Sequence, residues 1–437
     1  MKSIFDINLK KGFLMSHFNL INTLYDRGLI SHITHKDNLQ KLLQSNFISL
    51  YCGFDPTEES LHVGHLLPLI VLKRFQMLGH KPIVLIGGAT SLIGDPSFKQ
   101  KEREFYCSKN IDIWTKKISK QISCFLDFNC GRNSALLLNN NKWFKKINIL
   151  SFLREIGKYF SINTMINRSS VKQRISRPDQ GISFTEFSYN LLQAYDFFLL
   201  NQMHEVNLQI GGADQWGNIS AGMHLINRKS KKEVYGLTVP LLTQSNGVKF
   251  GKTESGTIWL DANKTSPYKF YQFWMNIEDK NIYNFLKMFT FISLSEIKKK
   301  EEQKYIDNKI IEDKTDLAKN ITRFIHGEEK LLAVERITEF LFLKGLQNIT
   351  ESDLQQLKQD GIPAIKVEKK IKDLQEALVL ASLATSRTQA KNMIFANAIS
   401  INTQKIKINH LFKNQDKLFG KFTLLSRGKK NHCLICW

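Results

Sequence analysis

The sequence predicts an α/β protein in which a parallel-sheet domain comes first, an α-helical domain follows, and a small basic α+β domain closes the chain. Three observations support this fold class. Short apolar, β-favouring runs at 47–53, 81–95 and 205–214 lead into glycines and a carboxylate. After residue 265 the apolar residues recur with a helical period. From residue 374 onward the chain is short and basic.

The elements follow in order along the first domain. Residues 47–53 (FISLYCG) predict a strand, the turn-forming DPTEESLHVGH follows it, and the amphipathic run 66–80 predicts a helix. The stretch 81–95 predicts a buried strand that ends in glycines and Asp95, and 205–214 repeats that pattern. Because ligand groups collect at the carboxyl ends of parallel strands, we expect a site at this edge of the sheet.

The amino-acid composition indicates the kind of binding partner and the cellular compartment of the protein. The 437 residues include 62 Lys plus Arg against 40 Asp plus Glu, a formal charge of +22, which favours a polyanionic partner, either nucleic acid or an acidic membrane surface. Six scattered cysteines are too few for a disulfide framework, so we expect a reducing compartment. No apolar run is long enough to cross a bilayer, and Asp6 interrupts any signal-like core, so the expected location is the cytoplasm.

Shifts in composition predict the domain boundaries. Met15 begins a helix-like run, so the residues before it read as a dispensable extension, and Gly361-Ile-Pro363 interrupts a polar stretch that reads as a linker. The final segment carries ten Lys/Arg against two Asp/Glu. The predicted parts are an extension (1–14), a sheet domain (15–260), a helical domain (261–345), a linker (346–373) and a basic domain (374–437).

The first motif is His62-Val63-Gly64-His65, here called the histidine motif, at the predicted start of a helix. Two histidines three positions apart share one helix face, and a helix N-terminus favours phosphate. Gly64 would let a flat base approach the backbone. The alternative is that the motif caps the helix and the histidines are incidental.

The second motif is Lys249-Phe250-Gly251-Lys252-Thr253, here called the lysine motif. Its lysines suit the capture of leaving phosphates, and the alternative is a lysine-bearing surface turn. A P-loop is excluded because only three residues separate Gly247 from Gly251 and a strand-like segment follows the threonine.

The third motif lies in the helix predicted at 184–200. Tyr189, Gln193 and Asp196 form one polar stripe on a helix that is otherwise mostly apolar. Such a stripe suits a zwitterionic ligand with a polar tip, and the alternative is an amphipathic surface helix. Cys433 and Cys436 lack a second pair at zinc spacing, so no metal site is expected there.

Together these residues resemble the bacterial tyrosyl-tRNA synthetases, which are class I aminoacyl-tRNA synthetases. The resemblance runs from about residue 16 to the end of the chain. HVGH resembles the class I histidine signature and KFGKT this family's lysine signature. YCGFDPT, GGATSLIGDPS, GISFTEFSYNLLQAYD, QIGGADQWGN and FGKFTLLSRGKKN match in the same order.

The resemblance implies a role for each matching position. The catalytic positions would be His62, His65, Lys249, Lys252 and Thr253. Tyrosine would be held at its phenol by Tyr51 and Asp196, and at its amino group by Asp95, Tyr189 and Gln193, with Gln215 nearby. The ATP side would comprise Gly53, Asp55, His62, His65, Gly212, Asp214 and Lys252, and a second mobile loop of the family would add the phosphate contacts Lys99 and Arg103.

The same resemblance implies the reaction and the partners. Tyrosine would be activated with ATP and Mg²⁺ to tyrosyl-adenylate and then transferred to tRNA(Tyr), with no tightly held protein-ligated metal. The parts would be a Rossmann-like catalytic domain with a dimerisation insertion, an anticodon-binding domain and a small ribosomal-protein-like RNA-binding domain, in a homodimer without membrane contact. Pro68 and Ala213 depart from the family pattern, which bears on ATP affinity only. The alternatives are a tryptophanyl sibling, a non-catalytic RNA-binding paralogue and a P-loop ATPase.

Overall fold

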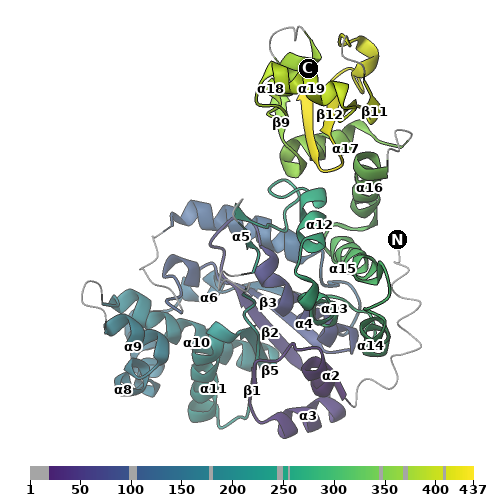
Figure 1. Ribbon diagram of the computed structural model, residues 1–437. Coiled ribbons are helices and arrows are strands. Elements are labelled where there is room, and N and C mark those ends of the chain that lie inside the picture. The colour runs from purple at the N-terminus through teal and green to yellow at the C-terminus, as the bar shows by residue number, and fades with distance from the viewer. Residues whose placement is uncertain are drawn as a thin grey trace. The chain divides into compact units, whose positions relative to one another are not determined.

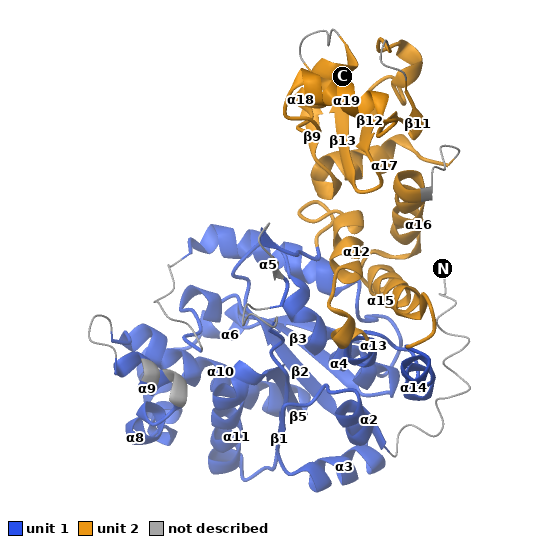
Figure 2. Ribbon diagram, in the orientation of Figure 1, with its two compact units in different colours: residues 1–260, 283–304 blue, residues 261–282, 305–437 orange. Residues whose placement is uncertain are grey.

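The computed structural model describes residues 19–97, 106–176, 181–243, 250–253, 256–343, 348–367, 373–406 and 410–437. The chain divides into two compact units, which Figure 2 colours separately. The first unit comprises residues 1–260 and 283–304, and the second comprises 261–282 and 305–437.

A six-stranded sheet forms the centre of the first unit (Figure 1). Its order is β1-β6-β5-β2-β3-β4, in which every neighbouring pair is parallel except β1 with β6. The predicted parallel α/β architecture is therefore confirmed. The strands are β1 (His32–Ile33), β2 (Ser49–Phe54), β3 (Lys81–Ile86), β4 (Leu136–Asn139), β5 (Val206–Gly212) and β6 (Tyr235–Val239).

The direction of strand addition reverses between β2 and β5. The chain proceeds outward from β2 through β3 to β4, then returns to β5 on the other side of β2 and continues to β6. Tyr51 of β2 lies opposite Gln209 of β5. In such sheets the crevice at the carboxyl ends of the two strands flanking the reversal is where ligands bind. Here that crevice is bordered by the residues that follow Phe54 and Gly212.

Helices pack against both sides of the sheet, so its strands are covered. α4 (Leu66–Met77) contacts β2 and β3, while α10 (Phe184–His204) and α11 (Trp216–Ser230) pack together over Tyr51, Ile83 and Leu85. The α10 helix begins at Ser183, whose hydroxyl accepts from Glu186 N and so satisfies one of the unpaired amides of the first turn. The long, mostly apolar α10 is thereby held against the core, as its sequence predicts.

Shorter helices complete the first unit. The insertion between β4 and β5 is helical throughout most of its described length, and α13 and α14 return to this unit after an excursion of the chain into the second. The remaining helices are α2 (Leu20–Asp26), α3 (Lys36–Ser45), α5 (Ser108–Ile122), α6 (Asn141–Phe144), α7 (Ile149–Glu155), α8 (Ile162–Ile166), α9 (Ser169–Ile175), α13 (Ile282–Phe289) and α14 (Leu294–Glu302), with the short strands β7 (Lys252–Thr253) and β8 (Gly256–Thr257).

The second unit contains a helical part and a five-stranded sheet ordered β11-β10-β12-β13-β9. A core that includes Leu378, Ile394 and Ile435 holds α18 and α19 together with the sheet. The elements are α12 (Pro267–Met275), α15 (Lys309–His326), α16 (Glu328–Thr338), α17 (Glu351–Gln356), β9 (Ala364–Lys366), α18 (Leu374–Leu380), α19 (Arg387–Phe395), β10 (Ile399–Ile401), β11 (Gln404–Lys405), β12 (Phe422–Arg427) and β13 (Asn431–Cys436), with π-helical turns at Glu339–Leu343 and Leu357–Gly361.

The prediction that the segment 346–373 is a linker needs correction, because part of this segment is folded. It contains α17 and β9, and β9 pairs in parallel with β13, where Ile365 lies opposite Ile435. Three residues suffice to complete a sheet edge, although so short a run carries no clear strand signal in the sequence. The units also place 283–304 with the sheet domain, apart from the rest of the expected helical domain. Among the helices of the described residues, none combines the length and the apolar character that a membrane crossing requires.

Candidate functional site

Tyr51 and Asp196 are buried together beneath the carboxyl edge of the sheet. Tyr51, on β2, is 1% exposed, and Asp196, on α10, is 2% exposed. The Tyr51 ring packs against Phe197 with 5.3 Å between ring centroids. Burial, with the nearby Asp196 carboxylate, raises the pKa of Tyr51 well above its ordinary value. Its hydroxyl is a buried donor without a hydrogen-bond partner among the described residues. An unsatisfied buried hydroxyl of this kind marks a place where a ligand's polar group fits.

Two side chains from the region after β4 hold the Asp196 carboxylate. Asn140 Nδ2 donates to Oδ2 over 3.0 Å, and Trp143 Nε1 donates to Oδ1 over 2.8 Å. Burial raises the pKa of Asp196 to about 8, although both hydrogen bonds act to lower it. The carboxyl is thus mostly protonated at pH 7, and a ligand that donates a hydrogen bond to it would favour the ionised form.

Asn140 also connects Asp196 to a second carboxylate. Its Nδ2 lies 3.0 Å from Thr90 Oγ1, and the Thr90 hydroxyl donates to Asp55 Oδ1 over 2.7 Å. The other Asp55 oxygen accepts from the Tyr189 hydroxyl at 2.8 Å. A continuous chain of hydrogen bonds therefore joins the buried Asp196 to Asp55 and Tyr189. Such chains stiffen the groups that they connect.

Asp95 anchors a separate group at the ends of β3 and β5. It is 7% exposed, and its Oδ2 accepts from Gln215 Nε2 at 2.7 Å. The backbone N–H of Ser97 donates to Oδ1 at 3.0 Å, and Asn218 Nδ2 approaches the same oxygen at 3.4 Å. The predicted neighbours Asp95 and Gln215 are therefore in direct contact. Gln193 is half-buried on α10, on the same helix as Tyr189 and Asp196.

The histidine motif forms a 3₁₀ turn, Val63–His65, that leads into α4. His62 Nδ1 accepts from Gly64 N at 3.0 Å, and His65 Nδ1 accepts from His62 N at 3.1 Å. Since Nδ1 accepts in both rings, Nε2 carries the N–H and is the donor. Burial and the adjacent His62 lower the pKa of His65 well below its ordinary value, so that ring is neutral near pH 7. The motif thus caps its turn and also presents two N–H donors.

The glycine at position 64 also makes room for a side chain of the motif itself. A Cβ added there would lie 2.7 Å from His62 Cε1, so glycine makes room for the motif's own imidazole. Gly53, at the end of β2, is also open, because an added Cβ there would meet nothing within 4 Å.

The lysine motif lies directly against the histidine motif. Gly251 has φ +87°, and a Cβ added to it would lie 3.2 Å from Val63 Cβ. Ile258 ties the two segments together, because its N–H donates to Gly251 O over 2.8 Å and its carbonyl accepts from Val63 N over 3.1 Å. Trp259 forms a β-bridge with His62. The two motifs, nearly 190 residues apart in sequence, thus lie side by side.

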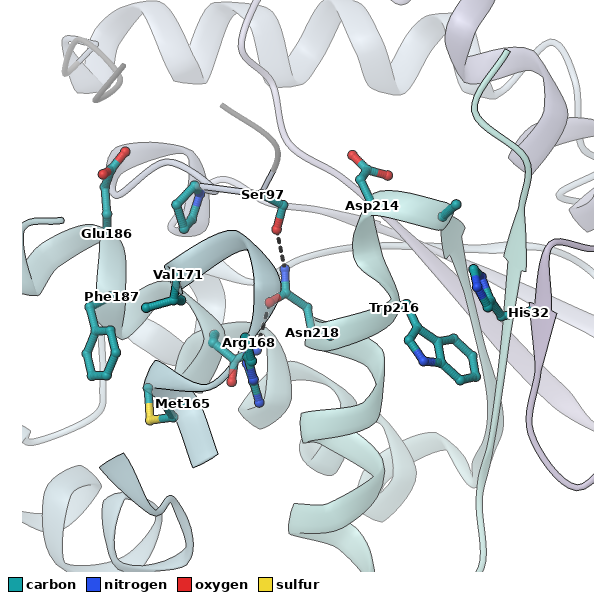
Figure 3. Close-up of a pocket in the computed structure, with 14 residues that line it drawn as sticks. His32, Ser97, Met165, Arg168, Val171, Glu186, Phe187, Asp214, Trp216 and Asn218 are labelled. Atoms are coloured by element: carbon teal, nitrogen blue, oxygen red, sulfur yellow. Dashed lines mark hydrogen bonds between the residues drawn. The ribbon is translucent and has the colours of Figure 1, made fainter. Parts of the chain in front are cut away.

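A pocket of about 370 Å³ is lined by residues next to Asp95 and Gln215 in the chain and by residues of the helical insertion (Figure 3). Asp214 is the predicted site residue among those that line it. Within the pocket wall, Asn190 Nδ2 donates to Asn218 Oδ1 over 2.7 Å, and Asn218 Nδ2 lies 3.5 Å from Ser97 Oγ. The lining residues are His32, Pro96, Ser97, Met165, Arg168, Val171, Glu186, Phe187, Asn190, Ala213, Asp214, Trp216, Gly217 and Asn218.

The structure therefore brings most of the predicted residues to one edge of the sheet. Lys99, Arg103 and Lys249 lie outside the described residues, and for Lys252 and Thr253 only the backbone is described, as the strand β7 that pairs with β8. Within the described ranges, no group of three or more His, Cys, Asp and Glu side chains is arranged as a metal site.

Sequence reasoning missed the residues that hold the predicted carboxylates. Asn140 and Trp143 position Asp196, Thr90 positions Asp55, and Asn218 contacts Asp95. A signal existed for Asn140, because the apolar run ALLL at 135–138 gives way to asparagines as other strands of the sheet give way to polar residues. Thr90 and Asn218 lie inside the matching segments GGATSLIGDPS and QIGGADQWGN, which drew attention to those segments but not to these residues, and nothing local distinguishes Trp143.

Comparisons with known proteins agree with this geometry. Residues 43–342 match the family model described as tRNA synthetases class I (W and Y), and residues 353–435 match the C-terminal domain of tyrosine–tRNA ligases. A tyrosine–tRNA ligase of Buchnera aphidicola subsp. Acyrthosiphon pisum (strain Tuc7) is 76% identical over 423 residues, which is 97% of this chain and 100% of the relative.

More distant relatives and a solved structure give the same result. A tyrosine–tRNA ligase of Salmonella arizonae is 55% identical over 425 residues, covering 97% of this chain and 99% of the relative. A crystal structure of a C-terminally truncated mitochondrial tyrosyl-tRNA synthetase of Aspergillus nidulans has a TM-score of 0.68 at 32% identity, and the match covers 77% of this chain and 97% of that one.

Proposed function

We propose roles for the site residues from the premise that this chain belongs to the tyrosine–tRNA ligases of the class I tRNA synthetase family. The chain accordingly activates tyrosine with ATP and charges tRNA with the tyrosyl group. Its partners are tyrosine, ATP and tRNA. What remains to be proposed is which side chain does what.

Tyr51 and Asp196 hold the phenol hydroxyl of tyrosine in this proposal. The observation that carries it is the unpartnered Tyr51 hydroxyl buried beside Asp196, two polar groups that a phenol oxygen would join. The substrate hydroxyl donates to the Asp196 carboxylate and accepts from the Tyr51 hydroxyl. Phenylalanine would leave both groups desolvated and unpaired, and a site built in this way rejects the analogue that lacks the hydroxyl. Asp95, Tyr189 and Gln193, with Gln215, hold the amino group.

In the same proposal, ATP binds at the carboxyl ends of β2 and β5. Gly53, Asp55, Gly212 and Asp214 border the nucleotide, with open space over Gly53. The tyrosine carboxylate attacks the α-phosphorus, forming the acyl-phosphate bond as the bond to pyrophosphate breaks and pyrophosphate leaves. Mg²⁺ enters with ATP as part of the substrate.

The histidine and lysine motifs stabilise charge in this step. The Nε2–H groups of His62 and His65 donate hydrogen bonds to phosphate oxygens, on which negative charge develops during the reaction. Lys249, Lys252 and Thr253 engage the pyrophosphate, and Lys99 and Arg103 add phosphate contacts. Because no proton must leave the attacking carboxylate, positioning and electrostatics account for the rate.

Tyrosine-dependent ATP–pyrophosphate exchange tests these roles. Tyr51→Phe should raise the KM for tyrosine and improve relative use of phenylalanine, since only the hydroxyl is removed.

Lys252→Ala should cut the activation rate strongly while the Kd for tyrosine stays the same. An equal loss of tyrosine binding and of activation in Lys252→Ala would contradict the assigned role.

We propose a homodimer formed through the helical insertion. Several large apolar side chains between β4 and β5 are exposed, and exposed apolar surface of this kind marks an interface. Sedimentation should give a dimer for the full chain, and Phe184→Glu with Ile162→Glu should give monomers; a monomeric parent protein would exclude the proposal. The exposed residues include Ile149, Leu150, Leu153, Ile162, Ile166 and Phe184.

The basic C-terminal part is proposed to bind tRNA in the cytoplasm, with the helical part contacting the anticodon. Lys429 and Lys430 are exposed in the turn between β12 and β13. Lys429→Glu with Lys430→Glu should raise the KM for tRNA and flatten the salt dependence of charging, because phosphate contacts release counterions. Exchange without tRNA should not change. The matched control is Lys298→Glu with Lys299→Glu on α14, and equal effects of the two pairs would exclude a specific role.

A further inference from the structure

Phe250, the aromatic residue of the lysine motif, packs against α13. Its ring meets Phe285 edge-on, with centroids 5.0 Å apart and an interplanar angle of 64°, and lies 6.2 Å from Phe289 at 28°. Phe289 is 1% exposed and Phe285 is 7% exposed, so the two rings are part of the core. Pairs of this geometry contribute more than their buried area alone.

The backbone beside Phe250 is fixed from the opposite direction. The N–H of Phe250 donates to Leu242 O over 2.9 Å, and Gly251 packs on Val63 of the histidine motif. Gly251 needs its positive φ at this point, where a larger residue would be strained and would press on Val63. Residues 250 and 251 therefore lie between α13 and the histidine motif.

Two arginines attach the far end of α13 to the same unit. Arg27 Nη1 donates to Lys287 O over 3.0 Å, and its Nη2 donates to Ile292 O over 2.6 Å. Arg74, on α4, donates from Nη2 to Thr290 O at 2.5 Å, and its guanidinium lies 4.6 Å from the centre of the Phe291 ring. Cations at the carbonyl end of a helix complement its dipole and satisfy its last acceptors.

These contacts form a closed cycle that links the two motifs, α4 and α13. The histidine motif leads into α4, Arg74 of α4 holds the end of α13, α13 packs on Phe250, and Gly251 returns to Val63 of the histidine motif. Figure 1 places α13 next to α4 accordingly. The lysine motif is thus located relative to the histidines both directly and through α13.

We propose that Phe250 is a positioning residue, an aromatic anchor by which α13 sets the place of the lysine motif relative to the histidine motif. This rests on the proposed function of Lys252. Phe250 touches no substrate in this role. It acts through the adjacent lysines, whose charge must lie where pyrophosphate forms. The end of α13 held by Arg27 and Arg74 is the fixed support of that anchor.

Pre-steady-state kinetics on the full-length protein tests the anchor. Phe250→Leu should lower the rate of tyrosyl-adenylate formation roughly tenfold and raise the KM for pyrophosphate in the reverse reaction, with the Kd for tyrosine unchanged. Phe285→Leu should have the same effect, and the double variant should lose no more than the larger single loss, because both changes break one contact. Phe250→Tyr keeps the ring and should restore the rate.

Controls separate the outcomes. Phe47→Leu, at a ring that is 54% exposed, should leave all constants unchanged. Multiplied effects of Phe250→Leu and Phe285→Leu, or a tyrosine Kd that rises with them, would overturn the anchor. If Lys252→Ala has no effect, the proposed function of the motif fails; if Lys252→Ala cuts activation and Phe250→Leu does not, the anchor alone fails. Should Phe285→Leu not fold, Phe250→Leu against Phe250→Tyr decides.

Discussion

The side-chain amide of Asn140 donates to the carboxylate of Asp196 over 3.0 Å from a position that is fully buried. The same nitrogen contacts Thr90, while the amide oxygen accepts from Ala89 N at 2.8 Å. Asn140 is therefore fixed on both sides, and through it the orientation of Asp196 is tied to the end of β3 and to Asp55. In the proposed assignment, the residues that recognise tyrosine and those that place the nucleotide belong to this one network.

Asn140→Ala should raise the KM for tyrosine. A hydrogen bond to a charged group contributes about 1.5–3 kcal/mol, so the expected change is roughly tenfold to a hundredfold. Discrimination against phenylalanine should fall at the same time, since Asp196 would lose its fixed orientation. Exchange kinetics with both amino acids measure this. Asn139→Ala is the matched control, because Asn139 caps Asn141 N instead. Equal losses for tyrosine and phenylalanine would refute an orienting role.

Tyrosine binding should release a proton near neutral pH. Asp196 has a pKa of about 8 in the free protein, so its carboxyl is mostly protonated at pH 7, and a phenol that donates to it favours the carboxylate. Release should approach one proton at pH 7 and decline as the pH rises through about 8. Titration calorimetry in two buffers of different protonation enthalpy measures the number. The Asp196→Asn variant should bind tyrosine without releasing a proton. If the parent protein releases none, the phenol does not donate a hydrogen bond to an Asp196 carboxylate.

The same carboxyl should affect the stability of the free protein in a defined direction. Because its pKa is raised from 3.8 to about 8 in the folded state, the folded protein binds the proton more tightly than the unfolded chain. Its contribution to the free energy of unfolding is full below the unfolded pKa and is lost as the pH rises through about 8. Comparing the parent with Asp196→Asn by urea denaturation across this range isolates that slope.

Gly64→Ala should slow activation and leave tyrosine binding intact. The added methyl group would lie 2.7 Å from His62 Cε1 and displace the ring, which breaks the hydrogen bond from Gly64 N. Loss of that bond and of the donor geometry should reduce the activation rate about tenfold. Gly157→Ala, where an added Cβ meets Leu153 at an ordinary 3.8 Å, is the control. A normal activation rate in Gly64→Ala would show that the position of His62 is unimportant.

Arg174→Met should destabilise the protein by about 3–5 kcal/mol. The Arg174 and Glu186 side chains are 2% and 1% exposed, and their 2.7 Å ion pair would leave a buried carboxylate without its cation. Arg174→Met with Glu186→Leu should recover much of that loss, because both charges are then gone. Denaturation midpoints measure the effect. The exposed pair Arg154–Glu155 is the control, and its removal should change nothing measurable.

The local sequence determined which segments form strands and which form helices. The runs around Tyr51, Asp95 and Gly212 predicted strands, and β2, β3 and β5 confirm their existence, although β3 ends at Ile86 and a 3₁₀ turn at Thr90–Leu92 precedes Asp95. Apolar periodicity fixes whether a segment pairs as strand or helix, and the glycines after each run mark where it ends. The ordered motifs also predicted the family, which the comparisons confirm.

Only the tertiary structure decided which distant side chains meet. The pairing of Asn140 and Trp143 with Asp196, the contact of Phe250 with α13, and the addition of β9 to the C-terminal sheet all join residues far apart in sequence. Such contacts depend on how whole elements pack, and no local pattern records a partner 50 residues away. The sequence by itself thus determined the reaction and the signature residues, while packing decided what holds those residues in place.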